Sequence, residues 1–538
     1  MRRTPLTRLA HALLAACSVS LSLGGLNLAP AHAASTESAT SVPAGIAWHE
    51  AQSEADVEQA FALARQNRQP VLLYWGASWC PPCNQLKATL FKRQDFIAQS
   101  RAVVAVHLDG DHAGAQKLGA RFKVTGYPTL ILFNPQGKEL TRLPGEADAR
   151  QVMQVLQLGM AGGRPVAEVL ADAKAGKTLG ANEWRLLGYY GWETDEQQLT
   201  PQAQRPALLM QLARASQAVD ADASTRLWLK ALSAEEAAKS FKPGAADRAR
   251  LQTLLADGAA SRAQMDVLTN FGADIVKTLA PQPGAARQAL LTPLDATLRH
   301  LQADTSLSTA DRLQALCARI DLARLDLAKT EIHPRLDPKL QQEVKAYAST
   351  LDHDVTDGYE RQAVIGTVAT ALSDVDLWDD SDNLLKTSLG KSHSPYYLMS
   401  HLGSNALKQG HKDEALHWYE QAFSNAEGPA TRLQWGSNYL KVLVDQAPQD
   451  EARIEKVSQQ VFAEAAQDSG AFYERSARSL KLISTKLLDW NAKGQHNAAL
   501  GRLKTQLNGI CAKLPAGDSQ KATCEALLKP GAAPATRT

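Results

Sequence analysis

Hydrophobic positions follow helix and strand periods in turn from about residue 46 to residue 162. In the first segment, apolar side chains recur at helical spacing, at Val57, Ala60, Phe61 and Ala64. The predicted elements are a helix at 54–66, a strand at 71–75, a helix carrying Leu86, Leu90 and Phe91, a strand at 103–108, a helix at 113–122, strands at 129–133 and 138–143 joined by the turn at 134–137, and a helix at 146–160. This order predicts an α/β domain, with a central mixed sheet flanked by helices.

The strand pattern ends near Gly163, and residues 163–538 consist of helical blocks separated by short Pro- and Gly-containing breaks. A stretch of this length is too long for one small bundle, so we expect an all-α array of paired helices. The best match to a tetratricopeptide repeat lies at 395–427, where small and aromatic side chains have the spacing of that repeat. They are Gly403, Gly410, Ala415, Tyr419 and Ala422, with Leu402 directly before the first of them. Stacked helix pairs create a concave surface, and whether it binds a protein partner stays open.

The N-terminal segment resembles an export signal. Arg2, Arg3 and Arg8 precede an apolar run, and Ala31-His32-Ala33 has the small-x-small pattern of a cleavage site. We therefore expect a signal peptide at 1–33, a linker at 34–45 and a periplasmic or secreted protein. In an alternative interpretation Cys17 is acylated and anchors a lipoprotein. No later run approaches the ~18 apolar residues of a spanning helix, so the mature chain is expected to have no transmembrane segment.

Charge excludes one class of partner. The 58 Lys and Arg residues nearly balance 56 Asp and Glu residues, and loss of the three N-terminal arginines leaves 55 against 56. Nucleic-acid binding needs a strongly basic surface, so no nucleic-acid partner is expected.

Candidate chemistry lies in the stretch Trp79-Cys80-Pro81-Pro82-Cys83, which follows the first strand and opens a helix. A helix N-terminus favours negative charge and lowers a thiol pKa, so Cys80 is the predicted nucleophile and Cys83 the resolving thiol. Pro81 and Pro82 suit a first helical turn because the N–H groups they lack have no partner there. Pro82 also removes one donor from the Cys80 thiolate, which favours reductase or isomerase work over strong oxidation.

Together with Gly126-Tyr127-Pro128-Thr129, this motif resembles the thioredoxin family, and residues 46–162 are similar to the thioredoxin-like domain of bacterial thiol:disulfide interchange proteins. The resemblance implies a cis peptide bond before Pro128, packed against the two sulfurs beside Trp79. It also implies that the Tyr127 backbone pairs with the extended chain of a substrate.

Two positions depart from that family. Tyr74 stands where relatives usually carry a buried acid that accepts the proton of the inner thiol, and Asn84 stands where a Lys often follows the second Cys. A tyrosine with a pKa near ~10 is a poor base at neutral pH. The proton acceptor for Cys83 is therefore open.

Other roles for the cysteines are less favoured. No second CxxC or paired His accompanies Cys80 and Cys83, so we expect no metal and no cofactor. Cys511 and Cys524 flank a break between two helical pieces, where a structural disulfide is preferred over a second redox site. Cys317 is expected to be a buried free thiol.

The sequence thus predicts an exported thiol:disulfide oxidoreductase that acts on protein disulfides, with a protein as its redox donor or acceptor. The alternative is a periplasmic binding or assembly factor built on the helical array, with the thioredoxin-like domain kept for docking.

Overall fold

A computed structural model describes residues 45–538 except 144–147, 235–236, 241, 329 and 530–538. The predicted signal peptide, its cleavage site near Ala33 and the alternative anchor Cys17 lie outside the described residues. Residues from Gly45 onward cluster as one compact unit. Among the described residues, no helix is both long and apolar enough to cross a membrane.

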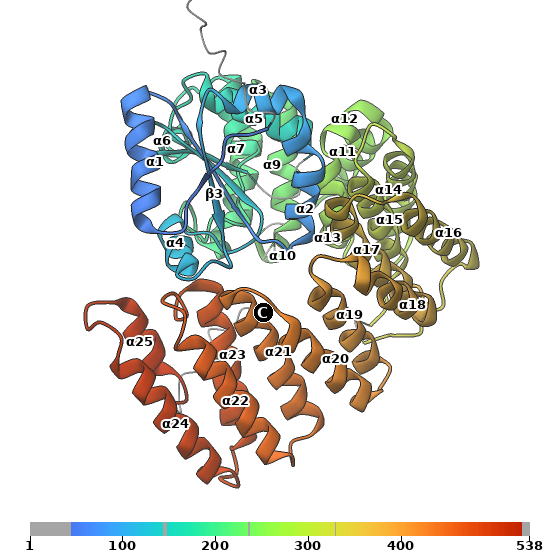
Figure 1. The fold of residues 1–538 in the computed structure, drawn as a ribbon. Coiled ribbons are helices and arrows are strands. Elements are labelled where there is room, and N and C mark those ends of the chain that lie inside the picture. Colours follow the sequence, from blue (N-terminus) through green and yellow to red (C-terminus); the bar gives the residue numbers. More distant parts are fainter. Residues whose placement is uncertain (1–44, 144–147, 235–236, 241, 329, 530–538) are drawn as a thin grey trace, which may run out of the picture. The chain divides into compact units, whose positions relative to one another are not determined.

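A five-stranded mixed sheet is built from the first part of this unit (Figure 1). Its order is β1 (His49–Glu50), β3 (Val104–Asp109), β2 (Val71–Gly76), β4 (Thr129–Phe133) and β5 (Glu139–Leu143). The central strand β2 runs parallel to β3 and antiparallel to β4, and all six of its residues are buried. A strand covered on both faces reads as a continuous apolar run, which is why the sequence predicted it.

Helices cover both faces of the sheet (Figure 1). They are α1 (Glu54–Asn67), α2 (Pro81–Ala88), α3 (Gln94–Ser100), α4 (Ala115–Phe122) and α5 (Ala149–Met160). Because successive strand residues point to opposite faces, Trp75 packs with α1 and α4 in one core, while Tyr74 packs with α2, α3 and α5 in the other. The predicted α/β fold class is confirmed.

The helix after the cysteines is shorter than its hydrophobic spacing predicts. The chain leaves helical geometry at Thr89, which has φ −114° and ψ −84°. Leu90 lies in a separate 3₁₀ turn, η1 (Leu90–Lys92), before α3 begins. The apolar side chains Leu86, Leu90, Phe91 and Phe96 still enter one core. Burial was therefore predicted from the pattern, but the break in the backbone was not.

The described residues after α5 form helices and turns without a strand, so the predicted all-helical region is confirmed. The helices are α6 (Val166–Lys174), α7 (Ala181–Gly188), α8 (Arg205–Ser216), α9 (Ala221–Ser233), α10 (Ala237–Ser240), α11 (Ala245–Ala256), α12 (Gly258–Ala263), α13 (Met265–Leu279), α14 (Ala285–Ala303), α15 (Thr309–Ala323), α16 (Pro338–Asp354), α17 (Gly358–Asp374), α18 (Trp378–Ser388), α19 (Pro395–Lys408), α20 (Lys412–Asn425), α21 (Pro429–Gln446), α22 (Glu451–Ala465), α23 (Glu474–Trp490), α24 (Asn497–Ala512) and α25 (Ser519–Ala526), with the 3₁₀ turns η2 (Gln202–Gln204) and η3 (Leu389–Lys391).

Three hydrophobic clusters succeed one another along this helical region. The first involves α6 to α15, the second α15 to α19, and the third α19 to the residues that follow α25. In the best repeat match, Gly403 of α19 lies against the ring of Tyr419 of α20, where an added Cβ would come within 2.8 Å. This is the kind of close helix contact that the small and aromatic spacing indicated. A tetratricopeptide period for the region remains a prediction.

The remaining cysteines lie in the helical region. Cys511 and Cys524 form a disulfide between α24 and α25, with a Cα–Cα distance of 5.6 Å. Cys317 of α15 is free and partly buried, and burial raises the pKa of its thiol to about 12. It is therefore unreactive at neutral pH.

Candidate functional site

The two sulfurs lie where the central strand gives way to a helix. The chain leaves β2 at Gly76, and Cys80 caps the N-terminus of α2, its Sγ accepting a hydrogen bond from the Cys83 N–H at 3.3 Å. Pro81 and Pro82 occupy the first turn. Cys80 and Cys83 are joined as a disulfide, with a Cα–Cα distance of 5.3 Å. The three-residue spacing on one helical turn therefore brings the two sulfurs within bonding distance, which disulfide exchange requires.

The second predicted motif lies against the same pair. The Tyr127–Pro128 peptide bond is cis. The Tyr127 ring stacks on Trp75 at 5.6 Å and meets the Trp79 ring edge-on at 6.0 Å. Trp79 and Tyr127 pack around the small cluster of Ala77, Cys80 and Cys83. Residues that lie far apart in the chain thus enclose one site.

Tyr74, on the inner side of the site, is not a ready acceptor for the proton of the Cys83 thiol. This side chain is buried, and its hydroxyl has no hydrogen-bond partner among the described residues. Burial, with smaller effects from Asp109 and Glu50, raises the pKa of Tyr74 further above its ordinary value. The phenol therefore stays protonated at neutral pH.

Asn84, the other departure from the family pattern, supports the loop before the helix. Its buried Nδ2 donates to the backbone oxygens of Ser78 at 2.6 Å and Cys80 at 2.8 Å. These bonds hold the segment carrying the outer cysteine against α2. The sequence indicated a lost charge at this position but not this structural contact.

Asp111 lies beside the site, and no motif in the sequence indicated it. It follows β3, is 8% exposed, and its Oδ2 accepts a hydrogen bond from Trp79 Nε1 at 2.9 Å. The same oxygen accepts from Thr431 Oγ1 at 2.7 Å, and Oδ1 pairs with Arg475 Nη1 at 3.0 Å. Burial raises the pKa of Asp111, while Arg475 acts in the opposite direction. One carboxylate thus links the motif to two helices of the helical region.

Aromatic and charged side chains from the helical region surround Trp79. Its ring lies 5.8 Å from Tyr397 and 5.5 Å from Trp435, centroid to centroid. The Arg475 guanidinium stacks over it, with Cζ 4.7 Å from the ring centroid. Gln362 Nε2 donates to the Trp79 backbone oxygen at 2.9 Å. With this cover in place, Cys80 is 2% exposed and Cys83 is fully buried.

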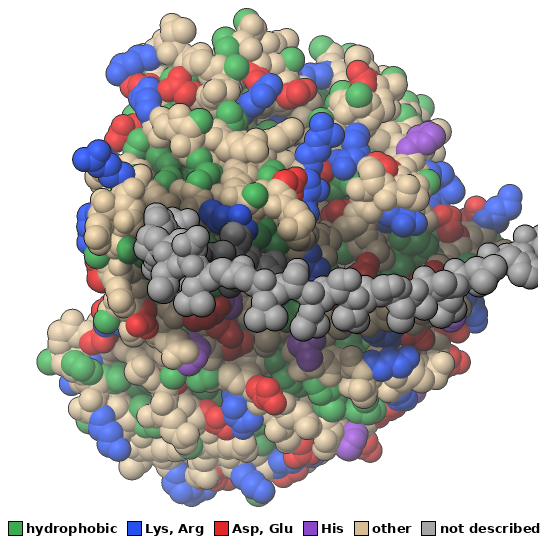
Figure 2. Space-filling model, turned by 45° about the horizontal axis from the view of Figure 1, so that its top comes forward, with side chains coloured by type: hydrophobic (Ala, Val, Ile, Leu, Met, Phe, Trp, Pro, Cys, Tyr) green, Lys and Arg blue, Asp and Glu red, His purple; other side chains and the backbone are tan. Residues whose placement is uncertain are grey.

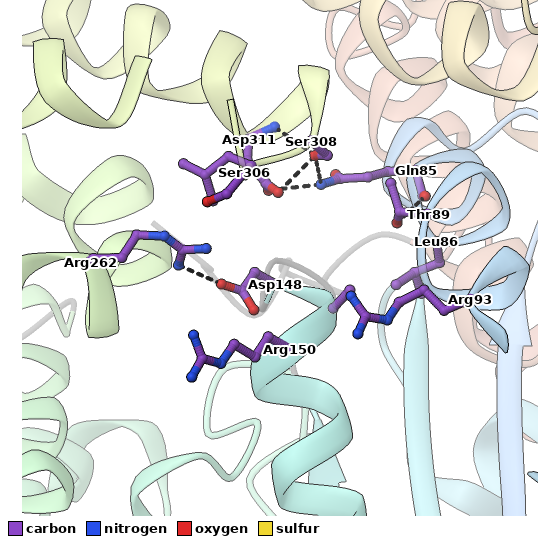
Figure 3. Close-up of a pocket in the computed structure, with 12 residues that line it drawn as sticks. Gln85, Leu86, Thr89, Arg93, Asp148, Arg150, Arg262, Ser306, Ser308 and Asp311 are labelled. Atoms are coloured by element: carbon purple, nitrogen blue, oxygen red, sulfur yellow. Dashed lines mark hydrogen bonds and ion pairs between the residues drawn. The ribbon is translucent and has the colours of Figure 1, made fainter. Parts of the chain in front are cut away.

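A polar pocket of about 260 Å³ lies at another part of this contact, between α2, α5 and the segment before α15 (Figure 3). Gln85 Nε2 donates to Asp311 at 2.8 Å, and Arg262 pairs with Asp148 at 2.6 Å across it. Several of the polar side chains that line the pocket are thus already bonded to one another. On the face seen in Figure 2, Lys and Arg side chains are interspersed with Asp and Glu, in keeping with the nearly balanced charge.

Comparison with known proteins agrees with this geometry. Residues 57–159 match the family described as a thioredoxin-like domain. The thiol:disulfide interchange protein DsbD 2 of Pseudomonas aeruginosa is 35% identical over 99 residues, which are 18% of this chain and 17% of that protein. DsbD of Pseudomonas fluorescens is 33% identical over 120 residues, 22% of this chain and 21% of that protein. The chain thus spans about a fifth of the length of these relatives.

Among solved structures, thioredoxin O2 of Arabidopsis thaliana in its oxidised state is 23% identical, with a TM-score of 0.19, and covers 21% of this chain and 93% of its own. The DsbH oxidoreductase is 22% identical, with a TM-score of 0.20, and covers 26% and 96%. The family match and the similarity to the DsbD proteins confirm the predicted resemblance at the level of the domain. The chain carries a thioredoxin-like domain with a CxxC-spaced disulfide, followed by a large helical region.

Proposed function

We propose that this protein is a thiol:disulfide oxidoreductase that exchanges disulfides with other proteins. The observation that carries the proposal is the Cys80–Cys83 disulfide at the N-terminus of α2, packed between Trp79 and Tyr127. A helix N-terminus favours the thiolate at Cys80 when the pair is reduced.

The proposed reaction moves two electrons from the reduced pair to a client disulfide. The Cys80 thiolate attacks one client sulfur, forming a mixed disulfide, and the other client sulfur leaves as a thiolate and takes up a proton. The Cys83 thiolate then attacks Cys80 Sγ, which forms the Cys80–Cys83 bond and releases the second client thiol. A dithiol donor protein restores the reduced pair. With a dithiol client, the same steps run in reverse.

The same proposal covers the direction of exchange, the surface that binds clients and the location of the protein. The absence of an N–H at Pro82 leaves the thiolate less stabilised, which favours reductase or isomerase work. The Tyr127 backbone pairs with the client chain, and the helical region selects or positions clients. The chain acts after export, in the periplasm or outside the cell.

A second candidate is a binding or assembly factor that keeps the thioredoxin-like domain as a docking module. The observation favouring it is the burial of both sulfurs beneath the helical region. In that case the Cys80→Ser/Cys83→Ser variant keeps its cellular role, and deletion of residues 163–538 abolishes it.

Insulin reduction driven by dithiothreitol separates the two candidates. The exchange function predicts turnover by the full chain that Cys80→Ser abolishes and Cys317→Ser leaves unchanged. Turnover of Cys80→Ser at the wild-type rate would refute it.

A further inference from the structure

The helical region closes the site that the exchange reaction needs. We propose that α21, α23 and the loop between α22 and α23 form a lid over the redox pair, which must move before a client can reach Cys80. This inference rests on the proposed exchange function, because it concerns the regulation of the same two sulfurs.

The lid contacts the side of the site on which the client is proposed to bind. Arg475 of α23 stacks on Trp79 and also lies over Tyr127, with Cζ 5.4 Å from that ring centroid. The Arg475 backbone N–H donates to Gln116 at 3.0 Å, and Gln116 in turn donates to the Tyr127 hydroxyl at 3.1 Å. Arg475 of α23 therefore lies against the side chain of the residue whose backbone is proposed to pair with the client.

Polar contacts hold the lid on the domain, together with the aromatic contact between Trp79 and Trp435 of α21. Arg475 and Thr431 bind the Asp111 carboxylate, and Asp468 accepts a hydrogen bond from the Gly114 N–H at 2.9 Å. Contacts of this kind are typical of interfaces between domains that move relative to one another. A carboxylate released from them can be solvated by water, so the open state leaves no buried charge unpaired.

Two glycines allow the lid to approach the domain closely. An added Cβ at Gly470 would lie 3.0 Å from Gly114 Cα, and one at Gly428 would lie 2.6 Å from Asp111 Cβ. The partners at these points are a backbone atom and a Cβ, which cannot rotate away. Closure therefore requires glycine at both positions. The methyl group of Gly470→Ala acts as a wedge that keeps the lid away from the domain.

The packing of the helical region offers a place for the lid to hinge. Helix α19 contributes Leu398 and Leu402 to the cluster of α15 to α18, while Tyr396 belongs to the cluster that contains α21 and α23. The cluster of the lid thus meets the preceding cluster at α19, where Tyr397 packs against both. The proposal places the hinge at α19, with α17 remaining in contact with α2.

Alkylation of the reduced full chain with iodoacetamide tests the lid. The rates at Cys80 and Cys317 are read by peptide mass, with the urea-denatured chain as the accessible reference. Arg475→Gln removes the charged contact and Gly470→Ala inserts the wedge. Arg502→Gln and Gly501→Ala are the matched controls, because Arg502 pairs with Glu455 on the helical surface and a Cβ at Gly501 meets nothing within 4 Å.

The lid predicts that Cys80 reacts far more slowly in the folded wild type than in the denatured chain. Both lid variants should raise its rate at least about tenfold, the factor that ~1.4 kcal/mol of lost closure gives. Both control variants should leave the Cys80 rate unchanged. An unchanged alkylation rate at Cys317 should show that the lid variants have not unfolded. Cys80 rates that stay at the wild-type value in both lid variants, or rise only together with Cys317, would overturn the lid. If Cys80 is alkylated faster in the two lid variants but these variants do not reduce insulin, the result supports the lid and refutes the exchange function.

Discussion

Arg475 and Trp79 lie face to face, with the guanidinium Cζ 4.7 Å from the indole centroid. Trp79 directly precedes the outer cysteine, and Arg475 belongs to a helix near the other end of the chain. A desolvated contact of this kind contributes about 2 kcal/mol. Because both side chains also bind Asp111, the contact ties the redox motif to the helical region.

Tyr74→Phe tests whether the inner tyrosine takes part in proton transfer. Its buried hydroxyl has no partner among the described residues, so removing it should leave the rate of insulin reduction and its pH profile unchanged. The free energy of unfolding should stay the same or rise by up to about 1 kcal/mol. Tyr190→Phe is the control, because the Tyr190 hydroxyl accepts from Gln198 at 2.9 Å and its loss should destabilise the fold. Slower exchange by Tyr74→Phe would make Tyr74 a participant.

Cys511 and Cys524 should stabilise the C-terminal helices and have no part in exchange. They are 13 residues apart, and closing a loop of this size stabilises a fold by about 3 kcal/mol. Urea unfolding should therefore show a lower midpoint in the presence of a reductant. Cys511→Ser/Cys524→Ser should abolish this reductant effect while insulin reduction continues. The Cys80→Ser/Cys83→Ser variant should keep the effect, and its absence there would contradict the assignment.

Much of the α/β domain could be predicted from local pattern. The buried run at β2, the spacing of Val57 and Phe61 on α1, and Cys80 at a helix start all follow from short-range rules. The end of α2 at Ala88 could not be predicted from hydrophobic spacing, because the buried Leu90 and the partly buried Phe91 enter the same core although the backbone is no longer helical.

The contact of the helical region with the site could not be predicted either. Asp111 and Arg475 are ordinary charged residues in the sequence, and they meet across a separation of 364 positions. No local rule links them. The sequence predicted a nucleophile at Cys80 but not its burial, because the helices that cover the neighbouring Trp79 belong to a distant part of the chain.

Gly403→Ala tests the packing of α19 on α20. The new methyl group would lie 2.8 Å from the Tyr419 ring, so the free energy of unfolding should fall by about 1–3 kcal/mol. Adding Tyr419→Leu should recover part of the loss, and Gly501→Ala serves as the control in open space. Urea unfolding measures all of these variants. An unchanged midpoint for Gly403→Ala would show that the two helices do not need this close approach.

His401 should make stability depend on pH. Burial, with a smaller effect from Lys408, lowers the pKa of His401 from 6.5 to about 4. The unfolded chain therefore binds the proton first, and stability should fall as the pH drops from 6.5 toward 4. Tm measured across this range should fall less steeply in His401→Gln. Equal slopes for wild type and variant would contradict this assignment.

The formation of a mixed disulfide at Cys80 tests the central claim most directly. In Cys83→Ala the resolving thiol is absent, so a client attacked by Cys80 stays attached. Incubation of the reduced variant with a peptide disulfide of known mass, alone and with Gly470→Ala to open the lid, should yield an adduct at Cys80. Cys80→Ser/Cys83→Ala should yield none. An absence of the adduct in both backgrounds, although iodoacetamide reaches Cys80, would contradict the proposed exchange.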